Sequence, residues 1–216
     1  MYAFVNGPLI WIAFAVFVLG SLWQIVSLVK MSKRTDKVFY QHYNAGGAAK
    51  SVWAWMMPYG SRGWREHPGF TLVTFVFHIC LILAPLFALG HITTLQFNRN
   101  FGWPTLSDGV INLMTLIFMV AALVLLIRRF VVPEVRIVTE AKDIALWVIV
   151  VLPFLTGYLS ANNMLLNPDL MLMLHVLTGC LMLICIPFTK LAHVFLFFMT
   201  RAFNGSEFAR RDTKTW

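Results

Sequence analysis

The sequence has little charge, few acidic residues and few cysteines. Only 12% of its 216 residues are charged and 59% are hydrophobic, whereas about a quarter of an ordinary soluble domain is charged. Its three cysteines, Cys80, Cys180 and Cys185, lie in apolar runs without CxxC spacing, so they indicate neither disulfides nor an iron–sulfur site. No internal repeat, low-complexity tract or nucleic-acid-binding module is present. These absences favour a membrane-embedded bundle over a soluble domain.

Five long apolar runs account for most of the hydrophobic residues. Each is long enough to cross about 30 Å of hydrocarbon at about 1.5 Å per residue. The first run has no basic segment before it and no usual cleavage site, so we interpret it as a retained helix. The sequence therefore predicts one all-α integral membrane domain over residues 1–216, a bundle of five transmembrane helices. The predicted spans are residues 8–29, 69–91, 109–127, 144–161 and 170–199.

Basic residues are concentrated in three segments. Residues 30–68 contain seven Lys or Arg, the 128–143 connection four, and the tail after residue 200 another four. The other two connections contain Arg99 alone. Because Lys and Arg accumulate in cytoplasmic loops, this distribution predicts an outside N-terminus and a cytoplasmic C-terminus. Segment 30–68 would then be a cytoplasmic loop.

The predicted cytoplasmic loop 30–68 is longer than a tight connection needs. Two compatible interpretations account for its apolar anchors: an amphipathic segment in the membrane interface, or a docking surface for a cytoplasmic subunit. The anchors lie among basic residues and are Trp53, Trp55, Met56, Met57, Tyr59 and Trp64.

Four of the six histidines, His78, His91, His175 and His193, fall within the predicted spans or at their ends. Polar side chains at membrane depth are expensive and usually face the bundle interior. In LHVLTGCLMLICIPFTKLAH the two histidines are eighteen residues apart, which is five turns, or about 27 Å, on a continuous helix. Bis-histidine haem b needs two imidazoles on opposite sides of one porphyrin, so facing helices must supply them in pairs.

Depth in the membrane predicts how these histidines pair. Counted from the cytoplasmic ends of two antiparallel helices, His78 matches His193 and His91 matches His175. The sequence thus predicts an inner and an outer haem b. His67 is a rival to His91, because an eleven-residue spacing from His78 leaves only about 20° between them on an ideal helix. We prefer His91, since His67 lies at the charged cytoplasmic rim and a proline kink at Pro85 changes the phase beyond it.

Several stretches resemble a known family. They are FH…GH in the second span, the connection RRFVVPEVRIVTEAKDI, and LHVLTGCLMLICIPFTKLAHVF in the fifth span. Together they resemble the gamma subunit of respiratory nitrate reductase and its relatives, the di-haem cytochromes b of sulfate-reducer transmembrane redox complexes and membrane heterodisulfide reductases. The long loop 30–68 and the thirteen-residue histidine interval are closer to the sulfate-reducer branch. The resemblance implies a five-helix bundle with its N-terminus outside, and iron ligation by His78 with His193 and by His91 with His175.

The resemblance also implies a function. The chain would be the di-haem b membrane anchor of a respiratory complex in a prokaryotic cytoplasmic membrane. It would transfer electrons between menaquinone, or a related quinone, and iron–sulfur or other redox subunits in a hetero-oligomer. These partners would dock on loop 30–68 and the C-terminal tail.

Four further residues are candidates for supporting roles. Lys190, one turn before His193, is a candidate contact for a haem propionate, or alternatively extends its amine to the membrane surface. Arg99, Trp103 and Asp108 are candidates for a quinone site at the outer haem. Asp108 could equally be a helix-start residue that the helix dipole favours.

Two other functions compete with this one. A proton or metal-ion transporter could use membrane histidines without haem, but it would be expected to have carboxylates along its path. Here the acidic residues lie in the connections and tails. In a purely structural anchor, the histidines would only form hydrogen bonds between helices.

Overall fold

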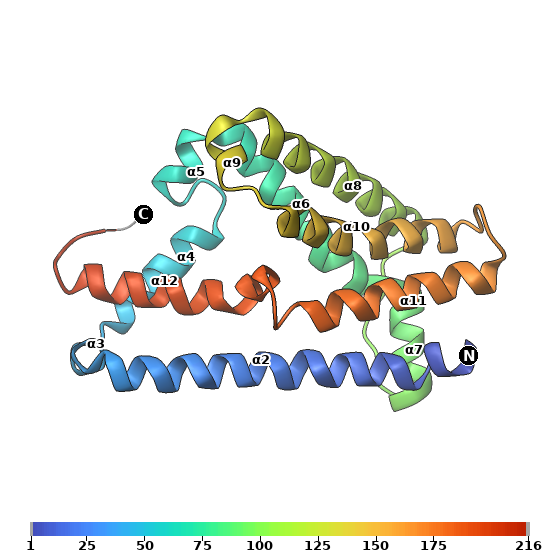
Figure 1. Ribbon diagram of the computed structural model, residues 1–216, viewed down its shortest axis with the longest axis horizontal. Helices are drawn as coiled ribbons and strands as arrows, with labels where there is room; N and C mark the ends of the chain where they lie inside the picture. The colour runs from blue at the N-terminus through green and yellow to red at the C-terminus, as the bar shows by residue number, and fades with distance from the viewer. Residues whose placement is uncertain (1, 215–216) are drawn as a thin grey trace. The chain divides into compact units, whose positions relative to one another are not determined.

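The computed structural model describes residues 2–214, except for the side chains of residues 97–99. Every regular element in this part of the chain is helical (Figure 1). The elements are α1 (Tyr2–Val5), α2 (Pro8–Thr35), α3 (Lys37–Gln41), α4 (Ala45–Met56), α5 (Arg62–Glu66), α6 (Pro68–Phe87), α7 (Leu89–Arg99), α8 (Asp108–Val131), α9 (Pro133–Ile137), α10 (Ala141–Ala161), α11 (Pro168–Cys185), the 3₁₀-helix η1 (Lys190–Ala192) and α12 (His193–Ala209).

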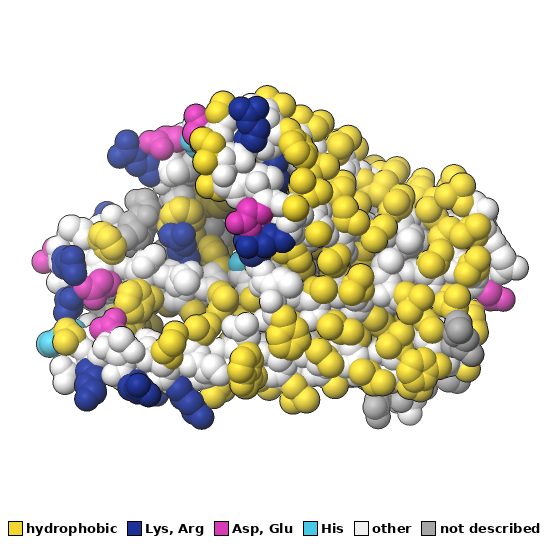
Figure 2. All heavy atoms as spheres, in the orientation of Figure 1, with side chains coloured by type: hydrophobic (Ala, Val, Ile, Leu, Met, Phe, Trp, Pro, Cys, Tyr) yellow, Lys and Arg dark blue, Asp and Glu magenta, His cyan; other side chains and the backbone are white. Residues whose placement is uncertain are grey.

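Five stretches among the described residues are long and apolar enough to cross a membrane: Tyr2–Thr35, which contains α1 and α2, and helices α6, α8, α10 and α11. The prediction of an all-α membrane protein with five spans is therefore confirmed. Large apolar side chains remain exposed on these helices, for example Leu19 at 65% and Val120 at 64%. Hydrophobic side chains cover the visible surface of α8 and α10, whereas Lys and Arg gather at the end of α2 (Figure 2). Such a surface suits a lipid environment.

The fifth predicted span, 170–199, is wrong as a single helix. Helix α11 ends at Cys185, a turn follows, and α12 begins only at His193 (Figure 1). The cause is Pro187, which lacks an N–H group and whose ring clashes with the carbonyl four residues earlier. His175 and His193 therefore do not share five uninterrupted helical turns.

The second predicted span, 69–91, is also divided. Helix α6 contains Pro85 and ends at Phe87, and α7 begins at Leu89. His91 thus lies on a different helix from His78. Segment 30–68 contains the end of α2 and the whole of α3, α4 and α5.

The chain forms two compact units, Met1–Thr71 with Cys180–Trp216, and Leu72–Gly179. The second unit is built around Phe118, whose side chain is fully buried. Phe118 stacks on Phe77 of α6, with ring centroids 4.8 Å apart, and on Phe154 of α10 at 3.9 Å. Cys80 and Ala84 complete this core. Both act as small apolar residues of this core.

The first unit holds α4 against α12 through small residues. A Cβ atom added to Gly47 would lie 2.2 Å from the Cβ of Ala209, and one added to Gly205 would lie 2.4 Å from the carbonyl oxygen of Gly47. Ser51 and Ser206 are also buried here. The two backbones approach so closely because these positions carry almost no side chain.

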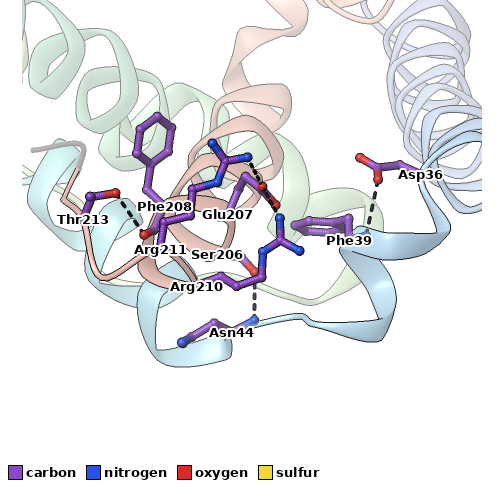
Figure 3. A network of polar contacts seen from close by, with 9 residues as sticks. All are labelled: Asp36, Phe39, Asn44, Ser206, Glu207, Phe208, Arg210, Arg211 and Thr213. Atoms are coloured by element: carbon purple, nitrogen blue, oxygen red, sulfur yellow. Dashed lines mark hydrogen bonds and ion pairs between the residues drawn. The ribbon is translucent and has the colours of Figure 1, made fainter.

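Polar contacts fix the end of α12 beside α4 (Figure 3). The backbone N–H of Asn44 donates to Ser206 Oγ at 2.8 Å. Glu207 Oε1 accepts from Arg210 at 2.6 Å and from Arg211 at 2.8 Å. The hydrogen bond from Arg210 is the largest cause that lowers the pKa of Glu207 below its usual value of 4.5. The carboxylate is therefore charged at neutral pH and anchors the end of α12.

Candidate functional site

The four histidines of the predicted spans share one local arrangement: each Nδ1 lies within hydrogen-bond distance of a backbone carbonyl. Because a carbonyl oxygen only accepts, each Nδ1 carries the hydrogen, and a neutral ring then keeps its lone pair on Nε2. Histidines that bind metals are oriented in this way. The other two histidines, His42 and His67, make no ring hydrogen bond within the described part. The pairs are His78 with Thr74 O (2.7 Å), His91 with Pro85 O (2.7 Å), His175 with Pro153 O (2.9 Å) and His193 with Lys190 O (3.0 Å).

The structure brings His91 and His175 together within the Leu72–Gly179 unit. Their Nε2 atoms are 3.4 Å apart, and their ring planes differ by only 4°. The ring centroids are 5.7 Å apart, which is 2.3 Å more than the distance between the two Nε2 atoms. This excess is about the width of one imidazole ring, that is, half a ring on each side. The two Nε2 atoms therefore lie on the line between the ring centres. The rings are coplanar and meet edge to edge rather than face to face.

This arrangement leaves two electron pairs directed at each other. While both rings are neutral and donate through Nδ1, neither Nε2 has a hydrogen to share with the other. An electron-pair acceptor between the two nitrogens would satisfy both. Metal–imidazole bonds are about 2.0 Å long, so a metal ion on this line requires the nitrogens to separate by only a few tenths of an ångström.

His91 is positioned by the break after α6. The last carbonyls of a helix have no helical donors, and each of the last four of α6 has another partner. His91 itself supplies one, because its Nδ1 donates to Pro85 O. The segment between α7 and α8 supplies two more and so lies over the end of the helix. The donors are Ala88 N for Ala84 O (3.0 Å), His91 Nδ1 for Pro85 O (2.7 Å), Trp103 Nε1 for Leu86 O (2.8 Å) and Leu106 N for Phe87 O (3.0 Å).

His175 is positioned by α10. Its Nδ1 donates to Pro153 O at 2.9 Å, and the hydroxyl of Thr156 is 3.5 Å from the same nitrogen. A Cβ atom added to Gly157 would lie 2.9 Å from His175 Cε1, so the absence of a side chain at Gly157 makes room for the imidazole. Thr178, one turn after His175 on α11, bonds to Thr156 at 3.1 Å. The ring is therefore fixed on several sides.

The remaining two histidines belong to different units, so their pairing stays a prediction. His78 lies in α6, with its Nδ1 on the carbonyl of Thr74 one turn earlier and its ring beside Phe77. His193 is the first residue of α12, and its Nδ1 contacts the carbonyl of Lys190 in η1. Each ring is thus oriented by backbone close to it in sequence.

The other predicted site residues have mixed outcomes. Lys190 orients His193 through its backbone carbonyl, a role that the sequence did not indicate. Trp103 Nε1 donates to Leu86 O at the end of α6. His91 lies shortly after that end, in the first turn of α7. Asp108 is the exposed first residue of α8, where the helix dipole favours an acidic side chain. The side chain of Arg99 lies outside the described residues.

Sequence reasoning missed the residues that orient the rings. Gly157 and the carbonyls of Pro85 and Pro153 carry no recognisable motif, although Pro85 and Pro153 are prolines inside helices. A proline within an apolar helix marks a place where backbone groups lose helical partners. Prolines inside the predicted spans could have pointed to the carbonyls of Pro85 and Pro153. They could not have indicated which histidines donate to these carbonyls.

The two-histidine donor set meets the requirement of haem iron but not that of a bare metal ion. No group of three or more His, Cys, Asp or Glu that could hold a metal ion occurs in the part of the chain that the structure describes. Protein zinc sites need three or four protein ligands, whereas haem iron takes only axial ligands from the protein. A Cβ atom added to Gly90 or Gly179, near His91 and His175, would meet no atom within 4 Å. The residues present therefore fit haem better than a bare ion.

These features define a multi-pass helical membrane protein with a facing pair of oriented histidines. A protein of Nitratidesulfovibrio vulgaris strain Hildenborough is 38% identical over 213 residues, which cover 97% of this chain and 94% of that protein. The chain belongs to one family with that protein, whose name states no activity. No family model matches the chain, and no solved structure is similar to it.

Proposed function

We propose that this chain is the di-haem b membrane subunit of a respiratory redox complex, related to the nitrate reductase gamma subunits and sulfate-reducer cytochromes b. It transfers electrons between a quinone and partner redox subunits. When bound, haem supplies the one-electron redox chemistry. His91 and His175 would hold the outer haem, and His78 and His193 would hold the inner haem. The chain also orients all four rings and excludes water with its apolar helices.

One observation carries the proposal: the Nε2 atoms of His91 and His175 face each other at 3.4 Å, while backbone carbonyls hold both Nδ1 atoms. Hydrogen bonding alone does not account for two facing acceptors. A merely structural histidine pair would share one hydrogen between the rings. The donor set thus supports His91 and His175 as the residues that would hold a metal group at this position.

The proposed orientation follows from charge. Lys33 and Arg34 end α2, and Arg128 and Arg129 end α8. Since such residues accumulate on the cytoplasmic side, the N-terminus lies outside a prokaryotic cytoplasmic membrane and the tail lies inside. The outer histidine pair then lies close to the outer surface.

The quinone site is proposed beside the outer pair. Trp103 and Leu106 bond to the end of α6, so the polar segment that contains them lies close to the break that positions His91. Quinone chemistry moves protons together with electrons and therefore needs water access and polar groups. Arg99 and Asp108 are the charged candidates in this region.

The partner subunits are proposed to dock on segment 30–68 and the tail. Trp53 is 64% exposed, and Met56 and Tyr59 are exposed as well. Exposed Trp, Tyr and Met beside basic residues are typical of interfaces. Trp55 differs, because the guanidinium of Arg201 lies 3.7 Å from its ring centroid. Trp53 is therefore the better candidate for a partner contact.

The competing functions predict different features. A proton or ion transporter would be expected to have acidic residues in mid-span, but Asp108, Asp143 and Asp169 all lie in the first turn of a helix. Asp143 also accepts from the N–H of Glu140 in a helix-capping arrangement. These positions favour helix capping over a proton path.

Spectroscopy of the purified complex tests the proposal. The reduced-minus-oxidised spectrum should show two haems b per chain, and His175→Ala or His91→Ala should each remove one. His67→Ala and His42→Ala are the matched controls and should keep both haems. A wild-type complex without haem b, or a His175→Ala variant with two bis-histidine haems, would contradict the proposal.

A further inference from the structure

In the turn between α11 and η1, the backbone carbonyl of Pro187 lacks its helical donor. In a continuous helix, Pro187 O would accept from the N–H of Leu191. That N–H is instead directed at Thr189 Oγ1, 3.2 Å away, where Thr189 caps η1. An unpaired carbonyl inside a membrane protein is strongly unfavourable. Gln24 of α2 supplies the donor, with its Nε2 2.8 Å from Pro187 O.

Gly20 allows this contact by bringing α2 close to the turn. A Cβ atom added to Gly20 would lie 2.9 Å from Pro187 Cγ and 3.1 Å from Phe188 Cζ. Gly20 and Gln24 are one helical turn apart, so both face the same neighbour. Pro187 is fully buried. The two residues of α2 therefore hold Pro187 in place: Gly20 leaves room for its ring, and Gln24 donates a hydrogen bond to its carbonyl.

The turn is connected to His193 through a short series of contacts. Thr189 Oγ1 donates to Cys185 O at 2.7 Å, and Ala192 N donates to Thr189 O at 3.1 Å. His193 Nδ1 then contacts Lys190 O at 3.0 Å. His193 lies only six positions after Pro187. A shift of Pro187 would therefore move the imidazole.

We infer that Gln24 and Gly20 are positioning residues for His193. Helix α2 contributes no histidine, yet it stabilises the turn that follows α11 and thereby contributes to the position of His193. A glutamine in an otherwise apolar membrane helix is expensive, and the carbonyl of Pro187 gives it a function. This inference rests on the proposed function, because His193 acts as a ligand only if haem is bound.

The test uses the purified complex and two separately measured haem signals. His193→Ala first identifies the signal that depends on the inner ligand. Gln24→Leu removes the donor at similar size, and Gly20→Ala pushes Pro187 away. Each should shift the midpoint potential of the His193-dependent haem and cause its partial loss. The other haem should keep its potential and its full amount. Ser21→Ala is the matched control, because this buried hydroxyl on α2 has no hydrogen-bond partner in the described region.

The outcomes separate this inference from the function on which it rests. A wild-type complex without haem overturns the proposed function. A wild-type complex with both haems, together with Gln24→Leu and Gly20→Ala variants in which neither signal changes, overturns the inference alone. Equal changes in both signals would also overturn it, since they would reflect general loosening of the bundle. If Gln24→Leu does not accumulate, Gly20→Ala provides the test.

Discussion

His91 and His193 each follow a proline in an apolar segment by six residues, but the two breaks are closed differently. At the first break His91 itself donates to the carbonyl of the proline, Pro85. At the second break the carbonyl of Pro187 accepts from Gln24 of another helix, and His193 turns to Lys190 O instead. The same spacing of proline and histidine therefore has two outcomes. His91 becomes part of the cap of its preceding helix, whereas the turn before His193 depends on a neighbouring helix, α2.

The two helices that follow the breaks also differ. Helix α7 has 11 residues and a polar C-terminal half, and its first turn is tied to the end of α6. Helix α12 has 17 residues, and its C-terminal part packs against α4 through small residues such as Gly205 and Ala209. The comparison indicates that His91 is oriented locally, whereas His193 depends on packing at both ends of its segment.

The largest expected effect comes from a side chain at Gly157, in the space that the imidazole of His175 occupies. Gly157→Ala would place a Cβ atom 2.9 Å from His175 Cε1. The imidazole must then move out of line with His91, so we expect loss of most of the outer haem and retention of the inner one, measured by haem content and redox titration. Gly63→Ala adds the same methyl group in open space on α5, away from the four histidines, and should change neither haem. An unaltered outer haem in Gly157→Ala would show that His175 is not held in this orientation.

The second prediction concerns the helix after the second break. Gly205→Ala would place a Cβ atom 2.4 Å from the carbonyl oxygen of Gly47. Because backbone must move, we expect a loss of about 3 kcal/mol of stability and weaker binding of the His193-dependent haem. The midpoint of denaturant unfolding measures the first effect. Gly63→Ala, with no atom within 4 Å of the added Cβ, should leave the midpoint unchanged. Equal midpoints in the two variants would disprove tight packing of α4 on α12.

A smaller effect is expected from the cap of α6. Trp103→Phe removes the donor to Leu86 O but keeps an aromatic ring. Loss of one hydrogen bond at a partly exposed helix end should lower stability by about 1 kcal/mol and broaden the spectrum of the outer haem only. The thermal midpoint and the haem spectrum are the measurements. Trp53→Phe, at an exposed indole, is the control. An effect of equal size in both variants would assign no capping role to Trp103.

The smallest effect concerns Glu207 near the end of α12. Its pKa is lowered chiefly by the hydrogen bond from Arg210. A carboxylate with a lowered folded-state pKa contributes stability that is complete above its unfolded pKa and is lost as the pH falls through the folded value. Amide exchange at the end of α12, corrected for intrinsic rates, should therefore be constant from neutral pH to about pH 5.5 and should accelerate below 4.5. Glu207→Gln should remove this pH dependence, and the same acid-induced acceleration in that variant would contradict the prediction.

The orientation of the histidine rings shows why part of the site could not be predicted. The four histidines within the apolar spans or at their ends could be recognised as candidate ligands from composition and spacing, since imidazoles are rare in such spans. Their Nδ1 partners could not, because the carbonyl that fixes His175 belongs to Pro153, far away along the chain. A backbone carbonyl has no sequence signature, and only packing decides which one a ring meets.

The sequence by itself determined the five apolar spans, the concentration of basic residues at certain ends and the four candidate ligands. These properties follow from transfer of side chains into lipid, which depends on residue type and run length alone. Tertiary structure decided where the second and fifth spans break. Pro85 and Pro187 made breaks available, but neighbouring donors such as Trp103 and Gln24 stabilise the carbonyls left without partners. The facing geometry of His91 and His175 was also decided at this level, because it requires the space at Gly157 and two carbonyls from separate helices at the same place.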